Sequence, residues 1–555
     1  MNYVIIALLV IRPFVCEQAN PSLAILFDIF FLSFFLLHIL FIKNLRTKKP
    51  VFLLSLIFPF LIIISNLFSV NSYNSDAELL RIFVLILVFN FVYFLNKRQR
   101  TVLIMGMLGI SAIICLRALY QYFSGIDFIK NSQTFEQLTE NGFYAWEQLS
   151  QKRVVSWFAS PNLLGGYLIA FFPIAGVYLI ENIRLKKRRA IVLFSFLCLF
   201  LFLSVLLTKT ISSFLSLMLS MIFLFTLLLW GKETRGMVRI AGIILVLFFV
   251  CLFGLFFKRS ESFFDLNNPQ NSLLQRVYYW QSGLKMISEH PMAGIGAGNF
   301  KTVYPRFKNV NANETIYVHN SYLQIWAESG LPALAFFLFF VFTVFNAALK
   351  KRPALLDAGI IAGCLAVLLH NLTDYSLFVN QAGHIWWILF GCVLADSEHD
   401  LSITQWLPKQ SLYLKSGYLL LTIILLFNVF LFFSSEHCIK KAVIFFKDRQ
   451  FNSSIIYAQK ALRYKPNNDL GYYILARNFR RIEGGNLSIK ALNYYKKAIS
   501  LNENYAFYYF ELAVYFLSHD QIDNAQRFAI LAIKRYPLNP EFQDLNLKIN
   551  KLKSK

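Results

Sequence analysis

The chain has 555 residues, of which 57% are hydrophobic and only 15% are charged. Soluble globular proteins carry about 25% charged residues, so this composition excludes an ordinary soluble enzyme. The formal net charge is +24, from 54 Lys and Arg against 30 Asp and Glu, and its meaning depends on where the charges lie. The seven Cys fall mostly in apolar segments without paired spacing, which predicts neither a disulfide framework nor a zinc site.

Apolar runs of about 17–25 residues, the length that crosses a bilayer, recur from the start of the chain to about residue 434. The clear ones lie near residues 23–42, 51–70, 79–95, 102–123, 163–180, 190–207, 211–230, 238–257, 331–349, 354–372, 383–395 and 413–433. Residues 3–15 form a shorter run that contains Arg12, and the lack of a small-residue cleavage site after it favours a first span over a signal peptide. The sequence therefore predicts an all-α polytopic membrane protein with about 12–13 transmembrane helices.

Clusters of Lys and Arg predict which loops face the cytoplasm. Five clusters lie at 43–49, 97–100, 184–189, 232–239 and 350–352, and two expected spans separate each cluster from the next. All five can be cytoplasmic, which places four segments on the opposite side: a loop at about 124–160, a link at 208–211, a long loop at about 258–330 and the tail after residue 433. Most of the basic excess lies in the clusters and the tail, so the net charge does not indicate nucleic acid.

The tail is water-soluble in composition and contains a repeat. Tyr472, Leu475, Ala476 and Phe479 recur 37 residues later as Tyr509, Leu512, Ala513 and Phe516, and the small residues of the matching second helices are Ala461, Ala498 and Ala532. A period of about 34 residues with small residues at fixed helical positions resembles tetratricopeptide repeats. The sequence thus predicts an α-solenoid over residues 436–555, a kind of domain that usually binds peptides or partner surfaces.

The long loop at about 258–330 is the longest polar interruption of the membrane body, and such loops commonly carry function. It contains an Arg shortly before a Trp, a Gly-rich run after His-Pro, and a His-Asn-x-Tyr-Leu run that leads through Glu-x-Gly into a span: Arg276, Trp280, His290–Phe300, His319–Leu323 and Glu328–Gly330. The Gly-rich run follows no strand, so it is not a dinucleotide-binding fingerprint.

In their order, these motifs resemble the O-antigen ligase/Wzy-type polymerase superfamily of bacterial membrane glycosyltransferases. Ser160–Tyr167 is similar to the family's Pro-Asn segment that opens a span, so the resemblance covers about residues 150–395. It implies a GT-C-like membrane body at residues 1–434, followed by the repeat tail that is common in the family.

The resemblance implies transfer of a glycan from an undecaprenyl-pyrophosphate carrier to an acceptor hydroxyl. The reaction is expected at the outer face of the inner membrane, with the long loop and the tail in the periplasm. Because pyrophosphate is already a good leaving group, no nucleotide is expected, and the resemblance implies that no metal or other cofactor is required. The expected partners are the lipid-linked glycan, the acceptor and the bilayer, with a protein partner through the tail and no nucleic acid.

Three acceptors fit the resemblance: lipid A-core for a ligase, a growing glycan for a repeat-unit polymerase, and protein Ser or Thr for an O-oligosaccharyltransferase. The loop motifs do not separate them, and the tail slightly favours a protein partner. A secondary transporter or flippase is an alternative that would show mid-membrane charges and repeated halves. A non-catalytic assembly protein would leave Arg276 and His319 without a role.

The resemblance also implies roles for single residues. Arg276 is the expected pyrophosphate ligand, because a guanidinium group binds phosphate oxygens in bidentate fashion. Lys209 stands where the family tends to place an Arg, so it keeps the charge but loses that geometry. Arg153 is a third candidate cation, and each of the three can instead be an interfacial anchor. His319 is the expected general base, with helix capping as the alternative.

Further residues near these motifs have weaker assignments. Trp280 and Tyr322 are candidates for stacking on sugar faces, as are Tyr317 and Trp326, although such aromatics more often form an interfacial belt. His370 and Asp374 lie at the end of a span and are expected to face the same cavity. The glycines at 294, 296 and 298 are expected to form a tight turn near the ligand. Glu328 either orients another polar group or has a structural role.

Overall fold

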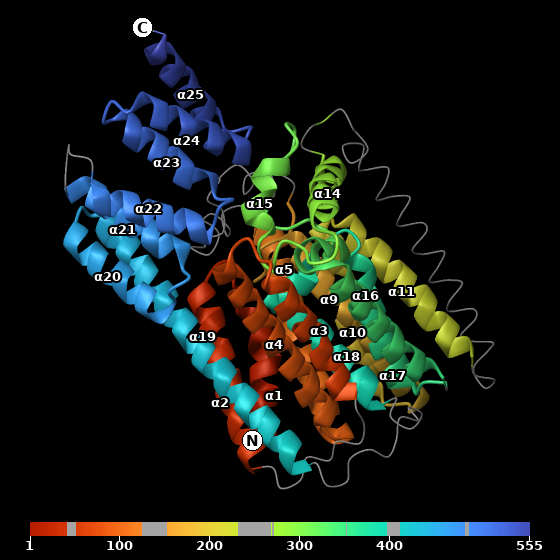
Figure 1. The fold of residues 1–555 in the computed structure, drawn as a ribbon. Coiled ribbons are helices and arrows are strands. Elements are labelled where there is room, and N and C mark those ends of the chain that lie inside the picture. Colours follow the sequence, from red (N-terminus) through yellow and green to blue (C-terminus); the bar gives the residue numbers. More distant parts are fainter. Residues whose placement is uncertain are drawn as a thin grey trace.

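The structure is a computed structural model that describes residues 1–41, 51–124, 152–230, 268, 271–350, 352–396, 411–482 and 488–554. Regular structure in these residues is entirely helical, which confirms the expected all-α class for this part of the chain (Figure 1). The membrane body contains α1 (Asn2–Ile11), η1 (Arg12–Phe14), α2 (Pro21–Phe41), α3 (Val51–Asn66), α4 (Ser72–Phe94), α5 (Lys97–Ser124), α9 (Pro161–Arg184), α10 (Arg188–Thr208), α11 (Ile211–Leu229), α14 (Ser272–Glu289), α15 (Phe300–Phe307), α16 (Ser321–Leu349), α17 (Leu355–His370), η3 (Ser376–Phe378), α18 (Asn380–Asp396) and α19 (Ser411–Lys447). The tail contains α20 (Phe451–Tyr464), α21 (Asp469–Ile482), α22 (Ile489–Leu501), α23 (Ala506–Leu517), α24 (Ile522–Arg535) and α25 (Pro540–Lys553).

Eight of the described helices are long and apolar enough to cross a membrane, namely α2, α4, α5, α9, α10, α11, α16 and α19. This result agrees with a polytopic membrane protein. Four further expected spans correspond to shorter helices, α1, α3, α17 and α18, of 10, 16, 16 and 17 residues. The span expected near 238–257, two basic clusters and most of the loop at 124–160 fall outside the described residues, so the total of about 12–13 spans stays a prediction.

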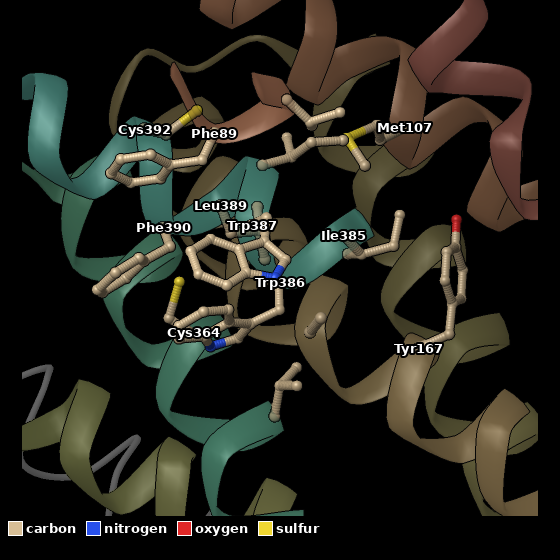
Figure 2. Packing of buried hydrophobic residues seen from close by; sticks show 14 of the residues in the cluster. Phe89, Met107, Tyr167, Cys364, Ile385, Trp386, Trp387, Leu389, Phe390 and Cys392 are labelled. Carbon is tan, nitrogen blue, oxygen red and sulfur yellow. The ribbon is translucent and has the colours of Figure 1, made fainter. Parts of the chain in front are cut away.

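The core of the membrane body is built around α18, which packs against α4, α9, α16 and α17. Figure 2 shows Trp386 and Phe390 of α18 beside Phe89 of α4 and Cys364 of α17. The rings of Trp386 and Phe390 stack with centroids 4.5 Å apart, and those of Phe89 and Phe390 lie 5.8 Å apart. A helix enclosed on all sides is expected to be apolar all round, and α18 is so from Ile385 to Ala395, whereas its first turns contain the buried polar residues Asn380, Gln381 and His384.

Gly330 divides α16 into two helices. Its φ of 81° and ψ of 169° are not helical, and a Cβ at this position would lie 1.9 Å from the carbonyl oxygen of Met292, so only glycine fits. The part after the break, 331–349, has the bounds expected for a span. The part before it, 321–329, belongs to the end of the bundle that carries α14 and α15, called the loop end below.

The turn at Gly294–Gly298 is tight, as expected, with φ values of 70°, 88° and 74° at its glycines. It lies against protein, because a Cβ on Gly294 would be 2.5 Å from the main-chain carbonyl of Glu328. The Glu328 carboxylate accepts a hydrogen bond from the N–H of Phe300, the first residue of α15, at 2.8 Å. Glu328 therefore has a structural role at a helix N-terminus.

The tail continues directly from α19, whose 37 residues make a rod of about 55 Å, well beyond the roughly 30 Å of a hydrocarbon core. Five alanines at the expected close positions are 0% exposed: Ala461, Ala476, Ala498, Ala513 and Ala532. Consecutive tail helices pack against one another, while their identity as tetratricopeptide repeats stays a prediction.

The tail also contacts the loop end of the membrane body. The hydroxyl of Tyr73 in α4 donates to Glu436 at 2.6 Å, and the hydroxyl of Tyr536 in the tail donates to Glu314 of the long loop. The tail therefore lies on the same side of the bundle as α14 and α15 (Figure 1).

Candidate functional site

His319 lies immediately before α16 and is enclosed by aromatic rings from two other elements. Its imidazole stacks on Tyr279 of α14 with centroids 5.2 Å apart and meets the ring of Tyr375 edge-on at 4.7 Å. The indole N–H of Trp280 donates to the main-chain carbonyl of His319 at 3.3 Å. His319 has a left-handed backbone, with φ 57°, which costs a non-glycine residue about 1 kcal/mol. The surrounding contacts hold this conformation.

Arg276 lies on α14, one turn before Tyr279. Its Nε donates to the carbonyl of Thr373 at 2.9 Å, and its Nη1 is 3.4 Å from the carbonyl and from the hydroxyl of Ser272. The guanidinium group thus connects α14 with the turn between α17 and α18. It is also close enough to His319 to act on it electrostatically. The fold therefore brings together Arg276 and His319, which are 43 positions apart in the sequence.

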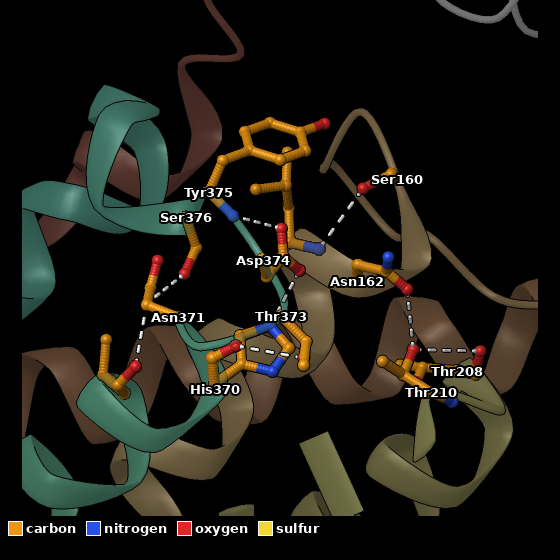
Figure 3. Close-up of polar contacts among 12 residues, drawn as sticks. Ser160, Asn162, Thr208, Thr210, His370, Asn371, Thr373, Asp374, Tyr375 and Ser376 are labelled. Atoms are coloured by element: carbon orange, nitrogen blue, oxygen red, sulfur yellow. Dashed lines mark hydrogen bonds and ion pairs between the residues drawn. The ribbon is translucent and has the colours of Figure 1, made fainter. Parts of the chain in front are cut away.

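The turn between α17 and α18 forms a third side of this site, because Thr373 accepts the hydrogen bond from Arg276 and Tyr375 contacts His319. Figure 3 shows the polar contacts within this turn. His370 Nε2 lies 2.9 Å from Asp374 Oδ2, and both side chains are 0% exposed. Ser321 Oγ donates to Asn371 Oδ1 at 2.7 Å, and Asn371 Nδ2 donates to Ser376 Oγ at 2.8 Å. Asn371 thereby ties the start of α16 to this turn, in which Asp374 is close enough to His319 to act on it electrostatically. That His370 and Asp374 face a common cavity stays a prediction.

The charges around His319 favour its neutral form. Burial, and after it the positive charge of Arg276, lower the pKa of His319 to about 4, while Asp374 opposes this shift. Burial alone would raise the pKa of Asp374, but His370, His319 and the N–H of Tyr375 together hold that pKa below its usual value. At neutral pH the site therefore contains an uncharged imidazole near a carboxylate and a guanidinium. Such an imidazole can accept a proton, and the carboxylate stabilises the resulting imidazolium.

Arg153 and Lys209 belong to a second group of residues. Arg153 Nε donates to the carbonyl of Thr208 at 2.9 Å, and its Nη2 donates to Asn162 Oδ1 at 3.2 Å. The hydroxyl of Thr210, the N-cap of α11, donates to the same Asn162 oxygen at 3.3 Å (Figure 3). Lys209 ends α10 with a left-handed backbone, φ 51°, and an exposed side chain. Two cations and the N-termini of α9 and α11 thus meet here, and both features favour anions.

The first turns of α9 join the two groups. A Cβ on Gly165 would lie 2.2 Å from Ser213 Oγ in α11, and a Cβ on Gly166 would lie 2.8 Å from Cδ2 of His370 in α17. Without side chains at these two consecutive positions, α9 packs closely against both α11 and α17, which also pack against each other. The link around Lys209 and the pair of His370 and Asp374 therefore adjoin the same first turns of α9.

Two of the four aromatic residues predicted to stack on sugars, Trp280 and Tyr322, are hydrogen-bonded to protein. Trp280 supports the carbonyl of His319, as described above. The Tyr322 hydroxyl donates to the carbonyl of Leu368 at 2.9 Å, and its ring lies 6.4 Å from that of Phe337. Both side chains remain partly exposed, so their stacking on sugars stays a prediction.

Sequence reasoning did not identify Tyr279, Asn371 or Tyr375, which enclose His319 or hold the turn beside it. One signal was present for the turn, because residues 371–376 form a polar run between two apolar spans. Tyr279 had no such signal, since it stands among other aromatic residues of α14. Among the described residues, no group of three or more His, Cys, Asp or Glu side chains is arranged to hold a metal ion.

A protein-family model described as O-Antigen ligase matches residues 196–338. The matched segment contains Lys209, Arg276 and His319, whereas Arg153 and Asp374 lie outside it. The match supports the resemblance to the O-antigen ligase/Wzy superfamily and to its membrane glycosyltransferases. No curated protein matches the chain.

Proposed function

We propose that this chain is a membrane glycosyltransferase that moves a glycan from an undecaprenyl-pyrophosphate carrier to an acceptor hydroxyl at the outer face of the inner membrane. The observation that carries the proposal is the convergence of Arg276, His319 and Asp374 at the loop end, with the O-antigen ligase match over the first two. The loop end then faces the periplasm, and so does the tail that contacts it.

The donor side of the reaction needs positive charge where the pyrophosphate leaves. Arg276 provides a guanidinium beside His319, and Lys209 provides an exposed ammonium at the link between α10 and α11. Arg153 is already bonded to Thr208 and Asn162, so it holds the link and adds positive potential at the N-termini of α9 and α11. Together these groups favour the charge that develops on the departing phosphate oxygen.

On the acceptor side, His319 takes the proton of the acceptor hydroxyl. The acceptor oxygen then bonds to the anomeric carbon of the glycan, and the bond from that carbon to the phosphate oxygen breaks. Undecaprenyl pyrophosphate leaves with the electron pair. The negative charge of the bound pyrophosphate raises the pKa of His319 in the complex, which makes it a stronger base at the moment of transfer. Asp374 stabilises the imidazolium that forms.

The acceptor divides the proposal into three subtypes: lipid A-core ligase, repeat-unit polymerase and protein O-oligosaccharyltransferase. The tail supports a macromolecular acceptor or partner, because it contacts the long loop through Tyr536 and Glu314. We therefore propose that its helical repeats, of tetratricopeptide type, bring a protein partner to the loop end.

The test compares glycolipid and glycoprotein in cells with the wild-type chain, without it, and with single variants. His319→Ala and Arg276→Ala should abolish the surface glycan while leaving the protein in the membrane. His437→Ala and Arg306→Ala replace exposed or partly exposed residues outside the site and serve as matched controls. Wild-type glycan in both site variants would contradict the proposal. Loss of chains from lipid, shortened chains or loss of glycoprotein identifies the subtype.

A further inference from the structure

Five charged side chains lie inside the membrane body without a part in the proposed chemistry: Arg12, Glu17, Asp28, Glu78 and Arg81. Arg12 is 0% exposed and Asp28 is 8% exposed. Arg81 Nε donates to Glu78 Oε2 at 3.0 Å, and Glu17 lies 3.8 Å from Arg12. Asp28 acts electrostatically on Arg12, and Arg81 acts on Glu17. Burying a charge costs free energy unless the charge is paired. We therefore expect this series of neighbouring side chains with alternating charge to have a specific role.

Two of these charges hold the segment between α17 and α18. Arg81 Nη1 donates to the carbonyl of Phe378 in η3, and its guanidinium lies over the Phe378 ring at 5.5 Å. Glu17 Oε1 accepts a hydrogen bond from the main-chain N–H of Asn380, the first residue of α18, at 2.9 Å. A carboxylate at a helix N-terminus is stabilised by the helix dipole as well. Residues 371–381, called the 371–381 segment below, are therefore held by α4 and by the turn before α2.

The turn that carries Glu17 is fixed in its own right. Arg12 Nη1 donates to the carbonyl of Val15 at 2.6 Å and so closes the turn. Gln381 Nε2 donates to the carbonyl of Pro13 at 2.5 Å. The position of the Glu17 carboxylate thus depends on Arg12 and on the segment that Glu17 itself holds.

The other side of the same segment forms a wall of the candidate site. The carbonyl of Thr373 accepts a hydrogen bond from Arg276, and the ring of Tyr375 lies edge-on to His319. Asp374 acts electrostatically on His319. Any displacement of the 371–381 segment therefore moves the groups that bury and polarise His319.

We propose that Glu17 and Arg81 are positioning residues, which hold the 371–381 segment so that Asp374 and Tyr375 stay against His319. Arg12 supports them by fixing the turn of Glu17. None of the three touches donor or acceptor; they act through the segment. The catalytic consequence rests on the proposed function, in which His319 is the base, while the contact itself is testable without any transfer reaction.

The test measures carbethoxylation of His319 by diethyl pyrocarbonate in the full chain in lipid nanodiscs, followed by peptide mass spectrometry over a range of pH. Only a neutral imidazole reacts, so the midpoint of the rate against pH reports the pKa. In Arg81→Met and Glu17→Gln, the loosened segment admits water to His319. Burial is the largest cause of the lowered pKa, so its loss outweighs the weaker effect of Asp374, and we expect a several-fold faster reaction and a midpoint about one pH unit higher, towards the ordinary value near 6.5. Arg81→Lys keeps a donor and should lie between wild type and Arg81→Met.

Two histidines and one variant provide controls. Exposed His290 should react equally in all proteins, and buried His38 in α2 reports global unfolding. Arg306→Met removes a half-exposed ion pair with Glu289 and should leave His319 unchanged.

Wild-type rate and midpoint at His319 in both Arg81→Met and Glu17→Gln would overturn the proposal. A transfer assay separates this failure from that of the proposed function. If His319→Ala keeps its transfer activity, the proposed function fails. If His319→Ala is inactive while His319 in Arg81→Met reacts like wild type, only the positioning role fails.

Discussion

Two single residues of the candidate site, His319 and Lys209, have left-handed backbones, with φ values of 57° and 51°. Non-glycine residues are uncommon in this region and are often held there at functional sites. At His319 the strain is offset by the helix that follows, because the Asn320 side chain accepts hydrogen bonds from the N–H groups of Tyr322 and Leu323. Histidine is enriched in this conformation and lysine is not, but the residue type alone did not predict it at either position.

The lowered pKa of His319 predicts that transfer falls only at low pH. A general base must be neutral to accept a proton, and the pH dependence of kcat/KM reports the pKa of that base in the free enzyme. Because the pKa of His319 is about 4, kcat/KM should stay level from about pH 8 to about pH 5 and fall near pH 4. In Asp374→Asn the charge that raises this pKa is lost, so the fall should move to still lower pH. The measurement is kcat/KM against pH, and a midpoint near 6.5 in the wild-type protein would contradict the assignment.

The substitution Lys209→Gly distinguishes the effect of the ammonium charge on transfer from the effect of the left-handed backbone on stability. Glycine adopts the left-handed conformation without strain, so the variant should be at least as stable as wild type. Loss of a charged hydrogen bond of about 1.5–3 kcal/mol should nevertheless lower transfer roughly tenfold or more. Lys209→Arg should retain activity, since arginine binds phosphate oxygens in bidentate fashion. Thermal stability and transfer are measured on the same preparations, and wild-type transfer in Lys209→Gly would exclude a phosphate contact.

The sequence singled out charged and titratable residues, such as Arg276 and His319, because these residue types are rare in an apolar chain and can bind phosphate or transfer protons. Their enclosure was not predictable, because it depends on a turn about 50–100 positions away in the chain. Asn371 shows the difference: the polar run 371–376 indicated a turn, but nothing in it indicated that Asn371 connects Ser321 with Ser376.

Among the helices, α9 is the element on which the composite site depends. Its start was predictable from Ser160-Pro161-Asn162, and the Ser160 side chain does cap the helix by accepting a hydrogen bond from the N–H of Leu163. The helices that pack against it were not predictable, because the need for glycine at 165 and 166 follows only from the close approach of α11 and α17. Similarly, the sequence predicted the apolar helix 331–349 but did not show that a short helix, residues 321–329, follows His319 and ends at Gly330.

A methyl group on α9 tests this packing. In Gly166→Ala the new Cβ would lie 2.8 Å from Cδ2 of His370, so His370 and Asp374 must shift. Overpacking of this kind typically costs about 1–3 kcal/mol, and transfer should fall roughly tenfold. Gly176→Ala on the same helix is the control, because a Cβ there meets nothing within 4 Å and alanine favours the helix. Equal transfer in the two variants would mean that the contact of α9 with α17 does not matter for the site.

For the whole molecule, the division into a membrane body and a helical tail followed from composition and from the repeat. The contact of the tail with the long loop was not predictable from the sequence. It consists of surface pairs such as Tyr536 with Glu314, each of which contributes little free energy and produces no recognisable sequence pattern. The contact has a topological consequence, since it requires the tail and the long loop to lie on one side of the membrane.

Labelling with a membrane-impermeant thiol reagent tests this arrangement. Ser288→Cys in α14 and Ser554→Cys at the end of the tail are both exposed and should react in intact spheroplasts. Lys350→Cys lies in a basic cluster expected in the cytoplasm and should react only after permeabilisation. Labelling of Ser288→Cys and Ser554→Cys from opposite sides would exclude the observed contact. Labelling of both only after permeabilisation would reverse the proposed orientation.

The most direct test of the proposed function is a transfer assay with the purified chain in nanodiscs. The donor is an undecaprenyl-pyrophosphate-linked glycan, and lipid A-core, an oligosaccharide and a Ser/Thr-containing protein are offered as separate acceptors. The proposal predicts release of undecaprenyl pyrophosphate together with transfer to one acceptor class, and loss of both products in His319→Ala and Arg276→Ala. Transfer at the wild-type rate by both variants, or no transfer by the folded wild-type chain to any of the three acceptors, would contradict it.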